Sequence, residues 1–397
     1  MPRLRIAFLL AFCLAPMAAC SGGGGGGPDA DAAERTEADA PRDPDGGDGP
    51  LPDPDLDAGP DADADPVPDA DGGNEADEGD LPPATLFDDM VLAAQGGRLV
   101  LGDGTEPAFS GAISCCMGGY GWPLYDEAWV DHGSARGVTF LHVRLGPFLT
   151  GPAGESDWAA VGGGYVEVDG KADLLAWNEA FWARVRALLE YAGSRGLWVE
   201  VDVADGWAVK HCRWGDLPGY SAWEAASNVQ GEDWCATAGS GGIAPGSVHD
   251  AWVRKVLLET GAFGNVIFED GNEVGLVDGY DPAWTLSILA VIREVEAEKG
   301  YRRHLLGTNS GDAGAMGAEG VDYIELHQPT APDPAGCFGK PCLSNEYNPD
   351  PAMTPEQLFA EVCSARALGT YFWYWRHGQT QEQMDATLGL IQAGECP

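Results

Sequence analysis

Short apolar runs alternate with amphipathic segments along residues 84–397. Eight of the runs are rich in branched and aromatic side chains, and a short run of this kind predicts a buried β-strand. The strands are expected at 109–113, 139–144, 197–203, 265–269, 304–308, 323–326, 342–345 and 370–374.

Apolar residues with helical spacing lie between several of these strands. The pattern is clearest at 173–192 and 248–260, and each segment is followed by a glycine that can end a helix. A hairpin is expected at 96–111, with two apolar arms around Gly102-Asp103-Gly104.

Eight strands with intervening helices in one domain predict an α/β fold, the (β/α)₈ TIM barrel. A doubly wound parallel sheet is the alternative, but no GxGxxG opens a helix after the first strand.

The first 20 residues have the pattern of an export signal. Two arginines precede an apolar segment that is too short to span a membrane and ends in small residues. Its end, Met17-Ala18-Ala19-Cys20, resembles the lipobox of bacterial lipoproteins, which implies lipidation of Cys20. Ser21 favours the outer membrane by the same analogy, whereas in an ordinary cleaved signal Cys20 would be incidental.

Residues 21–83 consist mainly of Gly, Asp, Pro and Ala. A segment with so few apolar side chains cannot offset the entropy lost on ordering, and its like charges extend it. It is predicted to be a disordered tether between the anchor and a catalytic domain at 84–397.

The chain has a formal net charge of −41, and residues 29–80 hold 20 acidic residues against two arginines. Nucleic acid and anionic membrane surfaces are therefore expected to be poor partners, since both need basic patches. The only membrane contact expected is through the N-terminal lipid.

Eight of the ten cysteines lie in the predicted domain, and an even number in an exported protein indicates disulfide bonds. Proximity in the sequence suggests the pairs 212–235, 337–342 and 363–396, and a vicinal pair 115–116. A zinc site is the weaker interpretation, because no paired CxxC or HExxH spacing occurs.

Polar and aromatic side chains follow the predicted strands at their carboxyl ends. The chemistry of a (β/α)₈ barrel lies at this end, so these residues are candidates for a functional site. They are Arg144, Asp202, Asp205, Asn272, Glu273, His327, Asn345, Glu346, Trp373 and Trp375.

Glu273 and Glu346 each follow an asparagine at a strand end. Asn-Glu also occurs at 74–75 and 178–179, so the position of the dipeptide matters more than its presence. Two carboxyl groups at one barrel mouth are what hydrolysis of a glycosidic bond requires. One protonates the leaving oxygen, and the other attacks the anomeric carbon or activates water.

Six segments between residues 96 and 378 resemble the clan A glycoside hydrolases, and family 5, with its cellulases and mannanases, most closely. FGNVIFEDGNEVG resembles the family's segment around the acid/base, and KPCLSNEYNP its segment around the nucleophile. The other four are GGRLVLGDGTEPAFSG, YAGSRGLWVEVDV, VDYIELHQ and LGTYFWYW. Ala204-Asp205-Gly206 stands where the family has a histidine after strand 3.

The resemblance implies a role for each matching residue. Glu273 becomes the general acid/base and Glu346 the nucleophile of a retaining mechanism, with their carboxyl groups roughly 5–5.5 Å apart. Asn272 would bind the sugar 2-hydroxyl, and Arg144 would keep Glu346 ionised. His327 matches the histidine of strand 6, where a structural and a catalytic role are both open.

Aromatic residues near the expected site have two interpretations. Trp373 and Trp375 lie two apart on a strand and share a face, as a sugar platform or as core. The segment 206–246 follows strand 3 and could stack on sugars or form a small core of its own. Its aromatic residues are Trp207, Trp214, Tyr220, Trp223 and Trp234.

The sequence thus predicts a monomeric, exported retaining glycoside hydrolase that cleaves β-glycosidic bonds in an extracellular polysaccharide or oligosaccharide, such as a β-glucan or mannan. No metal or organic cofactor is implied. A non-catalytic carbohydrate-binding barrel on the cell surface is the alternative, although such a protein should lose one carboxylate. An esterase of the α/β-hydrolase type would need a GxSxG motif, which is absent.

Overall fold

The computed structural model describes most of the predicted domain. The described residues are 86–107, 112–113, 127–149, 163–212, 221–277, 279–327, 334–347, 352–374, 381–393 and 396. The predicted signal, Cys20 and the tether lie outside them, as do Cys115, Cys116 and Trp375.

The centre of the fold is a parallel sheet of eight strands in the order β12-β11-β10-β9-β8-β7-β4-β3. The two edge strands approach each other, so the sheet curls into a TIM-barrel-like α/β fold. All eight strands lie within a few residues of their predicted positions. They are β3 (Ala112–Ile113), β4 (Phe140–Arg144), β7 (Trp198–Asp202), β8 (Val266–Glu269), β9 (Leu306–Thr308), β10 (Tyr323–His327), β11 (Cys342–Tyr347) and β12 (Thr370–Tyr374).

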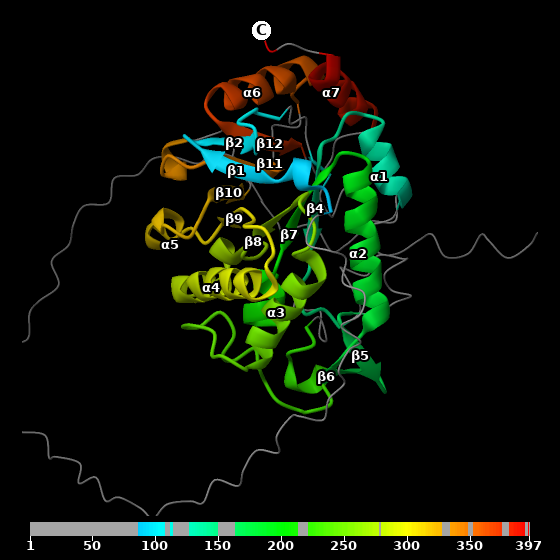
Figure 1. Cartoon of the computed structure of the whole chain (residues 1–397), viewed down its shortest axis with the longest axis vertical. Helices are drawn as coiled ribbons and strands as arrows, with labels where there is room; N and C mark the ends of the chain where they lie inside the picture. The colour runs from blue at the N-terminus through cyan, green and yellow to red at the C-terminus, as the bar shows by residue number, and fades with distance from the viewer. Residues whose placement is uncertain are drawn as a thin grey trace, which may run out of the picture. The chain divides into compact units, whose positions relative to one another are not determined.

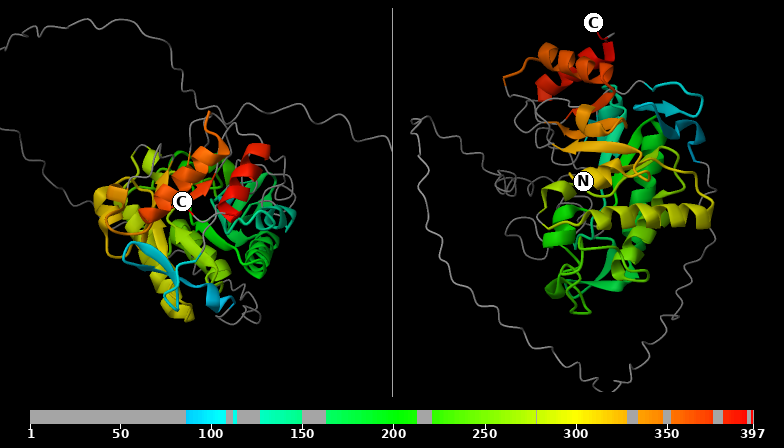
Figure 2. Two further views of the ribbon diagram at one scale, coloured as in Figure 1. Left: turned by 90° about the horizontal axis from the view of Figure 1, so that it is seen from above. Right: turned by 90° about the vertical axis from the view of Figure 1, so that its left-hand side faces the viewer.

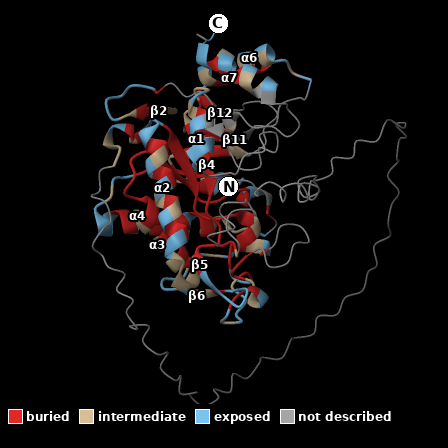
Figure 3. Ribbon diagram, turned by 90° about the vertical axis from the view of Figure 1, so that its right-hand side faces the viewer, coloured by how far each residue is buried: buried red, intermediate tan, exposed pale blue. Residues whose placement is uncertain are grey.

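Within the described ranges seven α-helices flank the sheet, with buried residues toward the interior of the fold and exposed residues outward (Figures 1 and 3). Five begin at a residue whose side chain accepts a backbone N–H, which fixes the helix start; these residues are Asn178, Ser247, Asp281, Asp312 and Thr354. The helices are α1 (Glu127–Ser134), α2 (Glu179–Ser194), α3 (Val248–Thr260), α4 (Pro282–Lys299), α5 (Ala313–Gly317), α6 (Pro355–Ala367) and α7 (Gln381–Ala393).

The prediction of a helix from residue 173 was wrong at its start. Residues 173–177 belong to strand β6 (Lys171–Trp177), which pairs antiparallel with β5 (Tyr165–Val168). Asp169 and Gly170 both have positive φ, as a two-residue hairpin turn requires, and Asn178 then caps α2. The Asp-Gly turn and the cap therefore divide a run whose apolar spacing alone suggested one helix.

The leading hairpin is also shifted from its predicted position. It consists of β1 (Leu92–Gln95) and β2 (Arg98–Leu101), joined by Gly96-Gly97, which both have positive φ. Gly102–Gly104 forms a turn after β2, and residues 108–111 of the predicted second arm lie outside the described residues. Met90, Leu92 and Leu99 pack on Phe140 and on other residues at the starts of the strands, so the hairpin closes this end of the sheet (Figure 2).

A cluster of tryptophans attaches the β5–β6 hairpin and the segment after β7 to the core. Trp252 on α3 is fully buried, and its indole N–H donates to the Val203 carbonyl at 2.8 Å. The rings of Tyr165, Trp182 and Trp223 lie 5.4, 5.5 and 6.4 Å from that of Trp252. Trp223 is therefore core and not a sugar platform.

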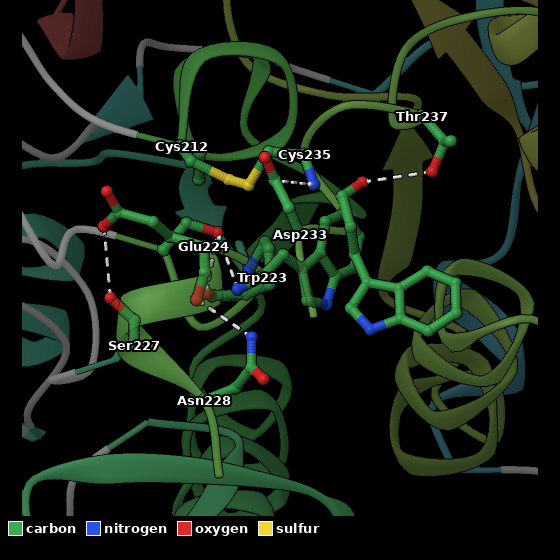
Figure 4. The surroundings of a disulfide bond; sticks show 12 residues. Cys212, Trp223, Glu224, Ser227, Asn228, Asp233, Cys235 and Thr237 are labelled. Carbon is green, nitrogen blue, oxygen red and sulfur yellow. Dashed lines mark hydrogen bonds between the residues drawn. A yellow bond between two sulfur atoms is a disulfide. The ribbon is translucent and has the colours of Figure 1, made fainter. Parts of the chain in front are cut away.

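Three of the predicted disulfide pairs occur: Cys212–Cys235, Cys337–Cys342 and Cys363–Cys396. The first joins the two ends of the segment that contains Trp223 (Figure 4). Short helical turns complete the described fold: the π-helix η4 (Trp207–His211) and the 3₁₀ turns η2 (Asp88–Met90), η5 (Ala225–Ser227), η6 (Val274–Leu276) and η7 (Pro334–Cys337). Among the helices of the described ranges, none combines the length and the apolar composition that crossing a bilayer demands.

Replacing Trp252 with alanine is expected to lower the free energy of unfolding by about 3–5 kcal/mol, because it removes a fully buried indole that several aromatic rings contact. Urea denaturation followed by tryptophan fluorescence and circular dichroism measures the change. Leu175→Ala is the control, since Leu175 is 85% exposed and its loss should change stability by no more than about 0.5 kcal/mol. Equal stability of the two variants would contradict a structural role for the cluster.

Candidate functional site

The segments after β7 and β8 stay paired beyond the last residues of these strands. Asp202 pairs with Glu269 at the strand ends, and Asp205 pairs with Asn272 three residues later. The Gly206 N–H donates to the Asn272 carbonyl at 2.8 Å, and the Asn272 N–H to the Ala204 carbonyl at 3.1 Å. The two segments are thereby held in a fixed register at the carboxyl end of the sheet.

Glycine makes this close approach possible. A Cβ on Gly271 would lie 2.8 Å from the Ala204 carbonyl oxygen, and one on Gly206 would lie 3.0 Å from the Asn272 carbonyl oxygen. Any other residue would push the two segments apart.

Arg144, Asp205 and Asn272 form a polar network at this edge. Arg144 is the last residue of β4, and its Nη1 lies 3.7 Å from Oδ2 of Asp205. Nδ2 of Asn272 donates to the same oxygen at 3.0 Å, while the Ala208 N–H donates to Oδ1 at 2.9 Å. All three side chains are buried, so each depends on the others for its polar contacts.

Burial raises the pKa of Asp205 from its ordinary value to about 6. The charge of Arg144 and the hydrogen bonds from Ala208 and Asn272 act in the opposite direction, and the nearby carboxylate of Glu273 raises the pKa further. Asp205 therefore changes its charge in the mildly acidic range.

Glu273 directly follows this network and is only 7% exposed. It accepts a hydrogen bond on Oε2 from the indole N–H of Trp207, which begins η4. Its φ of 58° and ψ of 21° are left-handed, a conformation that costs a residue with a side chain about 1–2 kcal/mol. Non-glycine residues held in this way concentrate at functional sites.

The other predicted site residues that the structure describes lie on the next strands around the sheet. His327 on β10 and Glu346 on β11 are register partners near the carboxyl ends of their strands, and Trp373 lies on β12. The carboxyl ends of β8 and β11, which carry the two predicted catalytic glutamates, thus lie at the same end of the sheet.

A second group of buried ionisable side chains comes from the last residues of β7 and β8 and from β4. Nε2 of His142 lies 2.7 Å from Oδ2 of Asp202, and both residues are fully buried. Burial and the charge of Asp202 raise the pKa of Glu269 well above its ordinary value, so a protonated Glu269 donates to Asp202. Within the described residues, these three are the group whose atoms could hold a metal ion, with ligand atoms inside 4.8 Å of one another. Nε2 of His142 and Oδ2 of Asp202 already pair with each other, whereas Oδ1 of Asp202 is buried without a hydrogen-bond partner among the described residues.

Asp205 was noted from the sequence only as a carboxylate after strand 3. Its position was a usable signal, because a carboxylate directly after a buried strand lies at the functional end of a barrel. Its contacts with Arg144 and Asn272 depend on the pairing of β7 with β8 and β4, which the sequence does not specify.

No protein-family model matches the chain, and no curated protein matches it in sequence. Among solved structures, the chain is similar to a protein of Bacteroides vulgatus ATCC 8482 described as a candidate glycoside hydrolase, with 13% identity and a TM-score of 0.54. The match covers 78% of this chain and 62% of that protein, so the chain spans less than two thirds of its length.

Two family 5 glycoside hydrolases match more weakly. One, from Bacteroides vulgatus ATCC 8482, has 13% identity and a TM-score of 0.49 over 78% of this chain and 73% of its own. The other is a mannosidase of Rhizomucor miehei, with 10% identity and a TM-score of 0.48. This match covers 77% of this chain and 98% of the mannosidase. The first likeness, at a TM-score of 0.54, defines a TIM-barrel-like α/β fold of the kind found in glycoside hydrolases.

Glu269→Gln should change how stability depends on pH. The folded state holds the Glu269 proton more tightly than the unfolded chain does. Ionisation of this group therefore lowers the free energy of unfolding as pH rises from about 4.5 through the folded pKa. Glutamine stays neutral and can donate to Asp202. Above pH 4.5 the free energy of unfolding of the variant should therefore rise relative to that of the wild type, by up to about 1.4 kcal/mol per pH unit.

Urea denaturation between pH 4 and 8 measures this difference, with the exposed Glu190→Gln as the control. A constant difference between Glu269→Gln and the wild type across this range would show that Glu269 is ionised in the folded protein.

Proposed function

We propose that the protein is a retaining glycoside hydrolase that cleaves β-glycosidic bonds. The observation that carries the proposal is the buried Asn272-Glu273 pair at the carboxyl end of β8, fixed by Arg144 and Asp205. The second carboxylate of such an enzyme would be Glu346, whose strand β11 ends on the same side of the sheet. The likeness in fold to glycoside hydrolases supports this assignment.

In the proposed reaction Glu273 protonates the glycosidic oxygen as its bond to the anomeric carbon breaks. The Glu346 carboxylate attacks that carbon and forms a glycosyl ester. Glu273, now deprotonated, takes a proton from water, and the resulting hydroxide hydrolyses the ester with net retention. The Trp207 N–H bonded to Glu273 would fix the orientation of this carboxyl group.

The remaining site residues would bind sugar. Asn272 is placed beside Glu273 and would contact the 2-hydroxyl, and Arg144 would hold Glu346 ionised. His327 on β10 and Trp373 on β12 would contact the substrate on either side of Glu346, together with Trp375.

The proposed substrate is an extracellular polysaccharide such as a β-glucan or mannan. In this proposal residues 1–20 direct export, Cys20 carries the lipid, and residues 21–83 hold a monomeric catalytic domain away from the outer membrane. A domain that binds glycan at the same place without cleaving it is the alternative that the experiment separates.

Reducing-sugar release from β-glucans, mannans and xylans tests the proposal. Glu273→Gln and Glu346→Gln should each lower kcat by about 10²- to 10⁴-fold, because one loses the proton donor and the other the nucleophile. On an aryl glycoside whose leaving group needs no proton, Glu273→Gln should lose much less activity in the first step, whereas Glu346→Gln should lose it on every substrate. NMR of the first-formed product should show the β-anomer.

Glu179→Gln is the matched control, since Glu179 occupies the same Asn-Glu dipeptide but lies at the start of α2 with its carboxylate paired to Lys255. It should keep full activity. Glycan binding without cleavage by the wild type would replace the enzyme proposal with the binding barrel, and an α-anomeric product would replace retention with inversion.

A further inference from the structure

Asp205 occupies the centre of the network that holds the proposed acid/base segment. Its Oδ2 receives Nδ2 of Asn272 at 3.0 Å and lies 3.7 Å from Nη1 of Arg144. Its Oδ1 receives the Ala208 N–H at 2.9 Å in η4, the turn that also carries Trp207. One fully buried carboxylate thus joins β4, the start of η4 and the segment after β8.

We infer that Asp205 is a positioning residue for the proposed glycosidase reaction, and that it acts through Asn272, Arg144 and the start of η4 rather than by touching the reacting atoms. The inference rests on the proposed function. Asp205 orients the Asn272 amide toward the sugar, and through η4 it places the Trp207 indole that bonds to Glu273.

The charge of Asp205 matters as well as its shape. Ionised Asp205 attracts the buried guanidinium of Arg144 and accepts from the Asn272 amide, whereas a neutral side chain loses the attraction to Arg144. Among the described residues, Arg144 and Glu273 are the ionisable groups with an electrostatic effect on Asp205. Arg144 favours the ionised form and Glu273 the neutral form.

The site therefore responds to pH through Asp205. Burial raises the pKa of Asp205 to about 6, so the carboxylate is neutral well below pH 6 and charged above it. The wild type should lose activity as pH falls through about 6, because protonated Asp205 no longer holds Arg144. Asp205→Asn imitates the protonated form at every pH and should abolish that step in the profile.

The first arm of the experiment compares kcat and KM of the wild type and Asp205→Asn between pH 4.5 and 8. At pH 7 kcat should fall by about 10- to 100-fold in the variant, because misplaced groups lower the rate far more than they weaken binding. KM should stay within about threefold. Asp205→Glu should restore the pH step, since it returns the charge, but only part of kcat.

Asp270→Asn is the matched control. Asp270 is a fully buried aspartate after β8 whose pKa burial raises to about 7, but its carboxylate accepts from Thr285 and Thr308, away from the Arg144 network. This variant should keep the kcat and the pH step near 6. Thermal unfolding should show that Asp205→Asn stays folded at the assay temperature across the pH range used, although the variant removes the carboxylate partner of buried Arg144. If Asp205→Asn loses stability and activity together, the role of Asp205 is structural and the positioning role is overturned.

The second arm does not depend on catalysis. In protein labelled with ¹⁵N-asparagine, the side-chain amide signal of Asn272, assigned from Asn272→Asp, should titrate near pH 6 in the wild type and not in Asp205→Asn. If the wild type cleaves no glycan but this signal titrates, the proposed reaction fails while the contact with Asp205 stands. If the enzyme is active and Asp205→Asn keeps both its kcat and the pH step, the positioning role is overturned.

Discussion

The arrangement of the site depends on the hydrogen-bonded pairing of Asp205 with Asn272 beyond the ends of β7 and β8. Strands usually diverge into loops at this end of a barrel-like sheet, but here the backbone bonds continue past the strands. Gly206 and Gly271 leave no Cβ in the space between the two segments. The side chains that follow are consequently fixed by backbone geometry rather than by loop packing.

That pairing places ionisable groups where water does not reach them. Arg144, Asp202 and Glu269 are the last residues of β4, β7 and β8, and they are buried together with Asp205, which follows β7. Burying carboxyl groups so close together costs free energy, and the protein limits this cost with an ion pair and with shared protons. A glutamate in a left-handed conformation adds strain beside them. Backbone strain and buried charge therefore occur together at this end of the sheet, a combination that is frequent at functional sites.

The pattern of apolar residues predicted the eight strands well, because buried parallel strands are continuous apolar runs that few other elements imitate. The pattern failed where the spacing of apolar residues predicted one element and the turn-forming residues predicted another. Residues 173–177 share the apolar spacing of α2, yet the Asp169-Gly170 turn commits them to a hairpin. For the leading hairpin, two glycine-containing turns lie close together, and only the packing of Leu92 and Leu99 against the strand starts selects Gly96-Gly97.

The sequence by itself predicted the eight strands of the parallel sheet, three disulfide pairs, and the position of Glu273 directly after a buried strand, since these follow from local pattern and proximity. Only the tertiary structure decided that Trp223 is core, that Trp207 bonds to Glu273, and that Asp205 joins Arg144 to Asn272. Each of these contacts connects residues that are far apart along the chain. Strand register and the burial of each side chain create them, and neither is encoded in a local pattern of residues.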